Sequence, residues 1–217
     1  MTDESGIADH RPTQVFGAER AKAFIDAVVA IAMTLLILPL MESVTDVADE
    51  DRSAAHWFGE HQWQLVSFVI SFAIIAMFWI SHHRLFAHVE RVSVGLLWAS
   101  VAWLLTIVWL PVATAMSGRM SDEDPLVRTI YIGSMLLTCL TSLVVRAYLR
   151  GHPQLHEISD RDLWHGMVAD LATALLFAAS LGLTLLVPAV SYFALFLMLL
   201  AGPVQALLGR LLRPAAR

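Results

Sequence analysis

The chain has 217 residues, of which 58% are hydrophobic and 15% are charged, and its formal net charge is -5 at neutral pH. Soluble domains carry about 25% charged residues, so this composition excludes an ordinary soluble domain and indicates a polytopic membrane protein. The one cysteine, Cys139, excludes an internal disulfide. The sequence has no basic stripe with interleaved aromatic residues, so nothing in it indicates a nucleic-acid partner.

The first seventeen residues are polar and mixed in charge, with no apolar region behind a basic start. This pattern predicts a cytoplasmic N-terminal tail at 1–17 and argues against a cleaved signal peptide. Six apolar stretches follow, each long enough to cross a hydrocarbon core of about 30 Å. They predict an all-α transmembrane domain over 18–210, with a short C-terminal tail at 211–217. The spans are expected at 18–40, 60–83, 93–116, 127–149, 163–187 and 189–210.

The first stretch begins with charged residues and continues with uncharged ones. Arg20 and Asp26 are costly at the mouth of a membrane span, so they need partners or a task. Ile31, Leu35 and Leu38 share one side of an ideal helix, and Thr34 lies beside them. Asp26 projects from the opposite face, toward neighbouring helices. A stripe of this kind is typical of a pore-lining helix, but also of a helix that faces lipid or packs in a core.

Two motifs carry a family resemblance. The first stretch contains Arg20-x-x-x-Phe24-Ile25-Asp26, and the second ends in Trp79-x-x-His82-x-x-x-Phe86. Together, in this order, they resemble the signatures of the transmembrane protein 175 family of potassium channels. The family usually has serine at the position of Ile25, so this chain lacks one hydroxyl of the local polar network. The motif assigns no role to His83, which follows His82.

The resemblance implies a homotetramer of six-helix subunits in a lipid bilayer, with the pore lined by the first helix of each subunit. Ile31 would form the narrowest layer, Leu35 and Leu38 would form further apolar layers, and Thr34 would contribute to ion discrimination. The resemblance also implies a pore without a carbonyl filter. We expect no cofactor and no fixed metal site, with potassium passing through the pore only transiently. The first two helices would be tied together by six residues: Arg20, Phe24, Asp26, Trp79, His82 and Phe86.

The physics of an apolar ring is consistent with that expectation. Four isoleucines offer an ion no ligand, so the ion crosses partly dehydrated or waits until the ring widens and wets. Potassium sheds water more readily than sodium, which favours potassium without fixed carbonyls. Asp26 and His82 are expected to form a charge-assisted pair that keeps the first two helices in register, and the histidine would make that register sensitive to pH.

Two prolines mark expected breaks in the spans. Pro39 is expected to end the regular hydrogen bonding of the first helix, because proline has no backbone N–H. Around Pro188, residues 187–191 are expected to form a tight hairpin between the last two spans.

The basic residues predict how the chain is oriented. Eleven of the fourteen lysines and arginines fall on the side of the two termini. The positive-inside rule then places both termini in the cytoplasm and the protein in the cell membrane.

Other classes of function remain possible on the sequence alone. Asp170 lies deep enough in the fifth span to count as an intramembrane carboxylate, which a proton- or cation-coupled transporter would use. A metal- or haem-containing membrane enzyme would use His82, His83 and His88, but adjacent histidines project about 100° apart and share a site poorly. A purely structural subunit is the third class. We expect a channel rather than an enzyme.

Overall fold

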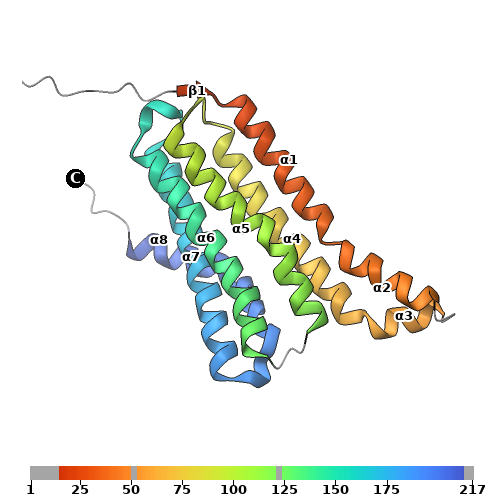
Figure 1. The fold of residues 1–217 in the computed structure, drawn as a ribbon. Coiled ribbons are helices and arrows are strands. Elements are labelled where there is room, and N and C mark those ends of the chain that lie inside the picture. Colours follow the sequence, from red (N-terminus) through yellow and green to blue (C-terminus); the bar gives the residue numbers. More distant parts are fainter. Residues whose placement is uncertain (1–14, 50–52, 121–123, 213–217) are drawn as a thin grey trace, which may run out of the picture.

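The computed structural model describes residues 15–49, 53–120 and 124–212, and it is almost entirely helical (Figure 1). The helices are α1 (Glu19–Leu35), α2 (Leu38–Asp49), α3 (Ala54–Glu60), α4 (Gln62–Phe86), α5 (Val94–Arg119), α6 (Pro125–Arg150), α7 (Asp160–Leu186) and α8 (Ala201–Leu211). The 3₁₀ segments are η1 (Pro153–Leu155) and η2 (Pro188–Leu200), and the two short strands are β1 (Val15–Gly17) and β2 (Arg91–Ser93).

Six helical stretches are long and apolar enough to cross a membrane. They run over Glu19–Thr45, Gln62–Phe86, Val94–Arg119, Pro125–Arg150, Asp160–Leu186 and Tyr192–Leu211. Their number and order confirm the prediction of an all-α polytopic membrane protein. Of the predicted tails, residues 1–14 and 213–217 lie outside the described residues, while residues 15–17 form β1.

Short polar residues start several of these helices. Ser93 accepts a hydrogen bond from the backbone N–H of Leu96 at the start of α5, and Asp124 accepts one from Leu126 at the start of α6. Ser159 does the same for Asp162 at the start of α7. Such caps satisfy N–H groups that have no partner inside the helix, so they fix where each span begins.

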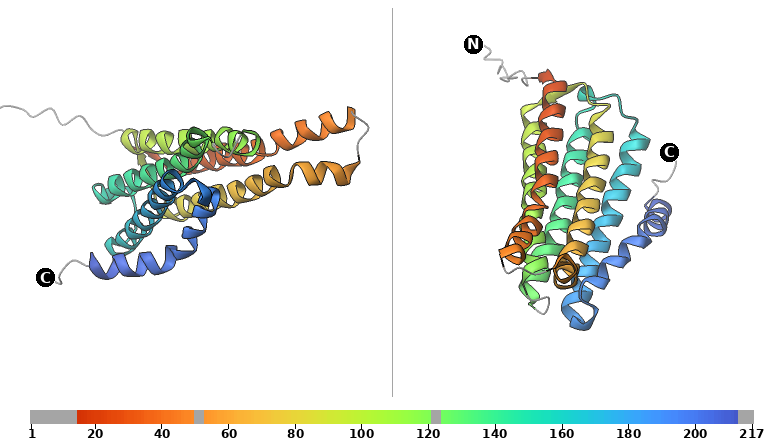
Figure 2. Two further views of the ribbon diagram at one scale, coloured as in Figure 1. Left: turned by 90° about the horizontal axis from the view of Figure 1, so that it is seen from below. Right: turned by 90° about the vertical axis from the view of Figure 1, so that its right-hand side faces the viewer.

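Helix α5 lies at the centre of the bundle and packs against α1, α4 and α6 (Figures 1 and 2). Its buried side includes Trp103 and Ile107, each with no exposed surface. Hydroxyl groups also join this region: Thr114 donates to Ser71 Oγ at 2.8 Å, and Ser71 shares a hydrogen bond of 2.8 Å with the hydroxyl of Tyr131. These contacts tie α4, α5 and α6 together within the bundle.

The chain reverses after α7, as the sequence predicts. Val187 separates α7 from η2, and Ser180 of α7 donates a hydrogen bond to the carbonyl of Ala194 at 2.8 Å. The last span is not straight, however. It bends where η2 meets α8, next to Gly202 and Pro203, and it lies along the outside of α7 (Figure 2).

The start of α1 is held by backbone pairing. Strands β1 and β2 are antiparallel, with Phe16 opposite Val92, and the N–H of Ala18 donates to the carbonyl of Glu90 at 3.1 Å. The segment before α1 is therefore attached to the connection between α4 and α5. This attachment positions the first turn of α1 at one end of the bundle.

Candidate functional site

Helix α1 has two different faces. Ile25, Val29 and Ala32 are 4%, 1% and 0% exposed, because they pack against the rest of the bundle. On the other face, Ile31 is 58% exposed and Leu35 is 39% exposed. Since residues three and four apart share a face of a helix, this exposed stripe is continuous. Ile31 and Leu35 therefore lie together on the exposed side of α1.

Thr34 lies on the same exposed face as Ile31. Its hydroxyl donates a hydrogen bond of 2.7 Å to the carbonyl of Ile31, one turn earlier. The hydrogen of the hydroxyl is thus committed to the backbone, while the lone pairs of the oxygen are free to accept. A cation that passed Thr34 would meet this oxygen, and not an O–H donor.

The first span is interrupted earlier than expected. Pro39 was expected to end the helix, but α1 ends at Leu35 and the chain continues as α2 from Leu38, with Pro39 in its first turn. Proline has no N–H for the carbonyl four residues before it, and its ring crowds that carbonyl, so the break falls one turn ahead of it. At the break, the N–H of Ile37 reaches the carbonyl of Thr34 at 3.3 Å.

Leu38 follows this break and is 46% exposed. It thus belongs to α2, whereas Ile31 and Leu35 belong to α1. Helix α2 leaves the bundle at an angle and runs alongside α3 (Figures 1 and 2). The position of Leu38 relative to the other two stripe residues therefore depends on the direction of α2.

Arg119, at the end of α5, holds the chain just after this break. Its Nη2 donates to the carbonyl of Pro39 at 2.6 Å and to the carboxylate of Glu42 at 2.7 Å. The sequence analysis missed this role. The available signal was an arginine at the end of one predicted span and a glutamate just after another, on the same side of the membrane.

Asp26 contacts the second span, on the face opposite the exposed stripe. Trp79 Nε1 donates to Asp26 Oδ1 at 2.8 Å, and His83 Nδ1 lies 3.5 Å from the same oxygen. We call Asp26, Trp79 and His83 the Asp26 joint. The costly carboxylate of α1 therefore has its partners on α4.

The expected pair of Asp26 with His82 is wrong, because His83 takes that place. Trp79 and His83 are four residues apart and project within about 40° of each other, whereas His82 projects about 100° from His83. His82 faces α5 instead and is 4% exposed. Its ring stacks on Trp103 with 3.9 Å between ring centroids and on Phe86 with 4.4 Å. His82 therefore joins α4 to α5, while Phe86 packs against His82 within α4.

Arg20 and Phe24 are also not in the Asp26 joint. Both lie on the exposed face of α1, where Phe24 is 59% exposed. Of the six residues expected to couple the first two spans, the structure brings Asp26 and Trp79 together. Arg20 and Phe24 instead extend the exposed stripe toward the start of α1.

A second polar contact lies deeper in the bundle. Arg146 Nε donates to Asp170 Oδ2 at 2.5 Å, and its Nη2 donates to Ser81 Oγ at 3.0 Å. The side chains of Arg146 and Asp170 are only 11% and 12% exposed. A Cβ atom at Gly166 would overlap Arg146 Nη1, so the absence of a side chain there makes room for the guanidinium. We call this contact the Arg146 joint; it links α4, α6 and α7.

The histidines do not form a metal site in the described part of the chain. No group of three or more His, Cys, Asp or Glu side chains there lies close enough to hold a metal ion. Fold and contacts thus define a membrane protein of six spans, whose first span is anchored through one face and exposed through the other.

Comparison with known proteins finds a family model that matches this segment. The sequence model of the endosomal/lysosomal potassium channel TMEM175 matches residues 20–111. That stretch includes both motifs, the exposed stripe and the Asp26 joint. Over these residues the chain is similar to the TMEM175 family.

Similar proteins occur in bacteria and in animals. A potassium channel of Streptomyces collinus is 34% identical over 105 residues, which is 48% of this chain and 50% of that protein. A potassium channel of a Chryseobacterium species is 26% identical over 133 residues, or 58% of this chain and 65% of that protein. The human endosomal/lysosomal proton channel TMEM175 is 25% identical over 209 residues, or 88% of this chain and 39% of that protein. The chain thus spans less than two thirds of the length of each of these relatives.

Proposed function

We propose that the chain is the subunit of a potassium-selective ion channel whose pore is lined by α1 of each subunit. The observation that carries this proposal is the division of α1 into two faces. One face is anchored to α4 and α5, and the other exposes Ile31 and Leu35. The TMEM175 match over residues 20–111 and the names of the two bacterial relatives support the same function.

The proposed pore is assembled from four copies of the chain. An isolated subunit leaves the stripe of α1 exposed, so we expect other subunits to cover it. Four-fold symmetry would bring the four stripes together around one axis. Ile31 then forms the narrowest layer, with Leu35 and Leu38 as further apolar layers. The lone pairs of Thr34 lie beside Ile31, where they offer weak ligands to a partly dehydrated ion.

An apolar ring without carbonyl ligands selects by the cost of dehydration. Potassium loses its hydration water at a lower cost than sodium, so it passes more readily. Such a ring opens when its helices separate. The break before Pro39 gives the first span a place where α2 can change direction relative to α1.

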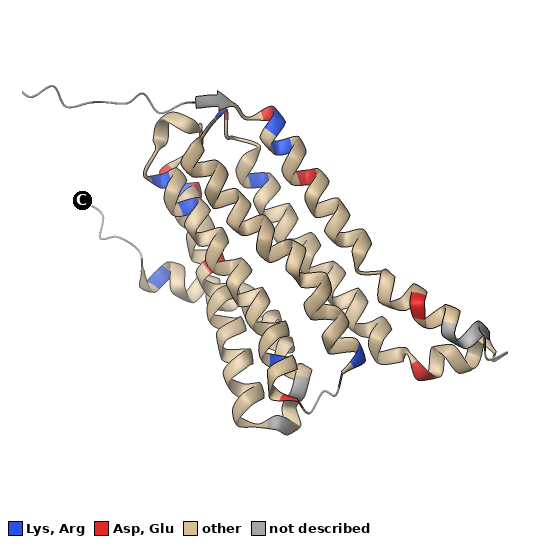
Figure 3. Ribbon diagram, viewed as in Figure 1, with Lys and Arg blue, Asp and Glu red and all other residues tan. Residues whose placement is uncertain are grey.

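The orientation in the membrane is also part of the proposal. Figure 3 shows the basic residues of the described bundle gathered mostly at the end where α1 begins. Arg20 and Lys22 lie near the start of α1, and Arg84 and Arg150 lie in the last turns of α4 and α6. Arg119, in the last turn of α5, and Arg128, near the start of α6, lie at the other end. The positive-inside rule places the richer end in the cytoplasm. Both termini then lie on the cytoplasmic side of the cell membrane.

The transporter hypothesis loses its main support in the structure. It depended on Asp170 as an intramembrane carboxylate that binds a coupling ion. Asp170 is instead bonded to Arg146, and an opposite charge at this distance satisfies the carboxylate. This contact favours a packing role for Asp170.

A reconstituted flux assay tests the channel proposal. Vesicles that contain the purified chain should pass potassium faster than sodium, and should pass N-methylglucamine least. Ile31→Asn should raise the flux and weaken the discrimination against sodium, because an amide wets the constriction. Leu105 is the matched control, since it is 71% exposed but lies on α5. Unchanged flux and selectivity in Ile31→Asn would contradict the assignment of Ile31 to the pore.

A further inference from the structure

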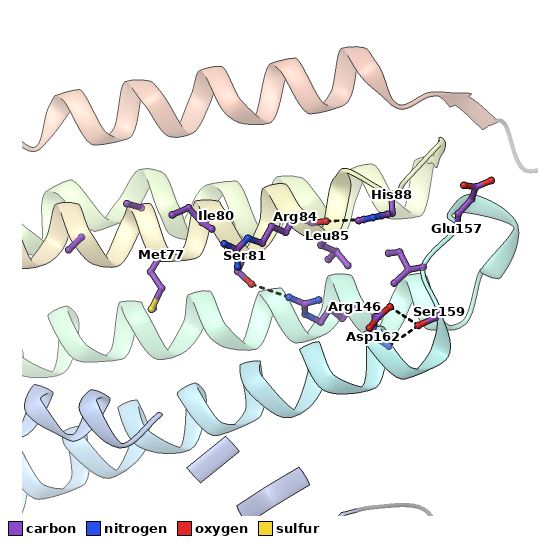
Figure 4. A pocket seen from close by; sticks show the side chains of 13 residues that line it. Met77, Ile80, Ser81, Arg84, Leu85, His88, Arg146, Glu157, Ser159 and Asp162 are labelled. Atoms are coloured by element: carbon purple, nitrogen blue, oxygen red, sulfur yellow. Dashed lines mark hydrogen bonds between the residues drawn. The ribbon is translucent and has the colours of Figure 1, made fainter. Parts of the chain in front are cut away.

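A cavity of about 920 Å³ lies between α4, α6 and the start of α7, away from the exposed face of α1 (Figure 4). One wall is an apolar strip of α4, formed by Ala73, Ala76, Met77 and Ile80. Met77 and Ile80 are 45% and 41% exposed, so the strip is continuous with the outer surface of the bundle. The volume is at the upper end of the range for small-molecule sites, about 300–1,000 Å³.

The cavity has the depth of one membrane leaflet. Its lining on α4 runs from Ala73 to Arg84, which is in the last turn of the span. Eleven residues of α-helix cover roughly 16 Å, and half of a hydrocarbon core of about 30 Å is ~15 Å. The cavity lining on α4 therefore extends from the membrane surface to the middle of the bilayer, with the apolar strip at its deeper end, and its depth matches the length of one lipid acyl chain.

The surface end of the cavity carries charges of both signs. Arg84 lies in the last turn of α4 and His88 lies just after that helix. Glu157 precedes α7, and Asp162 lies in its first turn, where its carboxylate accepts a hydrogen bond of 2.7 Å from Ser159 (Figure 4). The side chain of Arg84 is exposed and makes no ion pair with another described residue. The guanidinium of Arg146 is already engaged by Asp170 and Ser81.

This charge pattern favours one kind of headgroup. A purely anionic headgroup would be attracted by Arg84 but repelled by Glu157 and Asp162. A phosphate with a primary ammonium a few bonds away meets both sets, because an ammonium has three donors for carboxylates and a guanidinium binds phosphate. A choline headgroup has no N–H to donate to those carboxylates.

We propose that this cavity binds a zwitterionic phospholipid with a primary-amine headgroup, such as phosphatidylethanolamine, from the leaflet at the Arg84 end of the bundle. Arg84 holds the phosphate, Glu157 and Asp162 receive the ammonium, and the strip from Ala73 to Ile80 receives an acyl chain. This site is separate from the pore and does not depend on the channel function.

Lipid retention measures the proposal directly. The full chain is reconstituted in nanodiscs that contain equal amounts of phosphatidylethanolamine, phosphatidylglycerol and phosphatidylcholine with identical acyl chains. It is then released into detergent, and the bound lipids are counted by native mass spectrometry. We expect phosphatidylethanolamine to be retained in preference to the other two. Arg84→Gln and Glu157→Gln should each lower its retention about tenfold, as expected for the loss of a charge-assisted hydrogen bond.

Two further variants separate the site from general charge and from folding. Arg91→Gln removes an exposed arginine of β2, at the same end of the bundle but outside the cavity, and should leave retention unchanged. Ala76→Phe, in contrast, fills the apolar strip without changing any charge, and it should abolish the retention of phosphatidylethanolamine.

Three results would overturn the proposal. One is equal retention of the three lipids. Another is preferential retention of phosphatidylglycerol that Arg84→Gln abolishes, since it would show an anionic site. The third combines two observations: the unmodified protein binds no lipid, and Ala76→Phe changes the number of subunits. Together they would mean that a second copy of the chain covers the cavity.

Discussion

The two polar joints of this protein differ in how deeply they are buried. In the Asp26 joint, the side chains of Asp26 and His83 are 38% and 54% exposed. In the Arg146 joint, the corresponding values are 11% for Arg146 and 12% for Asp170. A half-exposed contact is weakened by water and salt, whereas a buried ion pair cannot be opened without leaving a charge uncompensated.

The difference matches the places of the joints in the bundle. The Asp26 joint holds α1, the helix that we assign to the pore, against α4. The Arg146 joint lies among α4, α6 and α7. Burial of the spans does not separate the joints in the same way: the most apolar stretch of the first span is 28% buried and that of α5 is 50% buried, but that of α4 is only 22% buried. The contrast between the joints therefore lies in the exposure of their own side chains.

The largest effect is expected from breaking the buried pair. Asp170→Asn leaves Arg146 charged and unpaired, which should lower the free energy of unfolding by about 3–5 kcal/mol. The melting midpoint, followed by the tryptophan fluorescence of the purified chain, measures this loss. The double variant Arg146→Met with Asp170→Leu removes both charges and should recover most of it. If Asp170→Asn melts like the unmodified protein, the Arg146 joint does not fix the core.

A smaller effect on stability is expected at the Asp26 joint. Asp26→Asn keeps an oxygen for the indole of Trp79 but removes the charge near His83, so the expected loss is about 1 kcal/mol. Potassium flux should rise, because α1 is held less firmly against α4. Trp79→Phe, which deletes the indole N–H, should raise flux in the same direction. If Asp26→Asn lowered the stability as much as Asp170→Asn, the predicted difference between the two joints would be contradicted.

The smallest effect on stability is expected at Arg119. Its ion pair with Glu42 is exposed, with 43% and 65% of the two side chains accessible. Arg119→Gln should therefore lower the free energy of unfolding by less than about 1 kcal/mol. The difference from the unmodified protein should shrink further in 1 M salt, where exposed charges are screened. A difference that is large, or that salt does not change, would mean that Arg119 holds α2 by more than an exposed contact.

The sequence predicted the spans better than their internal geometry. Runs of apolar residues of the right length sufficed to predict six spans, because a bilayer sets the length of an element. The sequence predicted the break at Pro39, but the helix ends about one turn earlier, because the N–H that proline lacks would have bonded to the carbonyl four residues before it. The bend between η2 and α8 lies next to Gly202 and Pro203, a pair that signals a break but interrupts no run of apolar residues.

For the residues of α1 and their partners, the sequence predicted what one helix determines and missed what depends on how helices are arranged. Helical spacing was enough to place Ile31 and Leu35 opposite Asp26, because both follow from one helix. The choice between His82 and His83 depended on the rotation of α4 relative to α1, which no single helix determines. The partners of Arg119 and Arg146 likewise lie on other helices, so only the assembled fold brings them together.

Thiol accessibility along α1 tests the central claim most directly. Cys139 is the one cysteine of the chain, so Cys139→Ser provides a cysteine-free background for single cysteines at Ile31, Leu35 and Leu105. If α1 lines the pore, a charged thiol reagent should block potassium flux through the Ile31→Cys and Leu35→Cys variants and leave Leu105→Cys unaffected. Block of Leu105→Cys together with unaffected flux in Ile31→Cys would contradict the account.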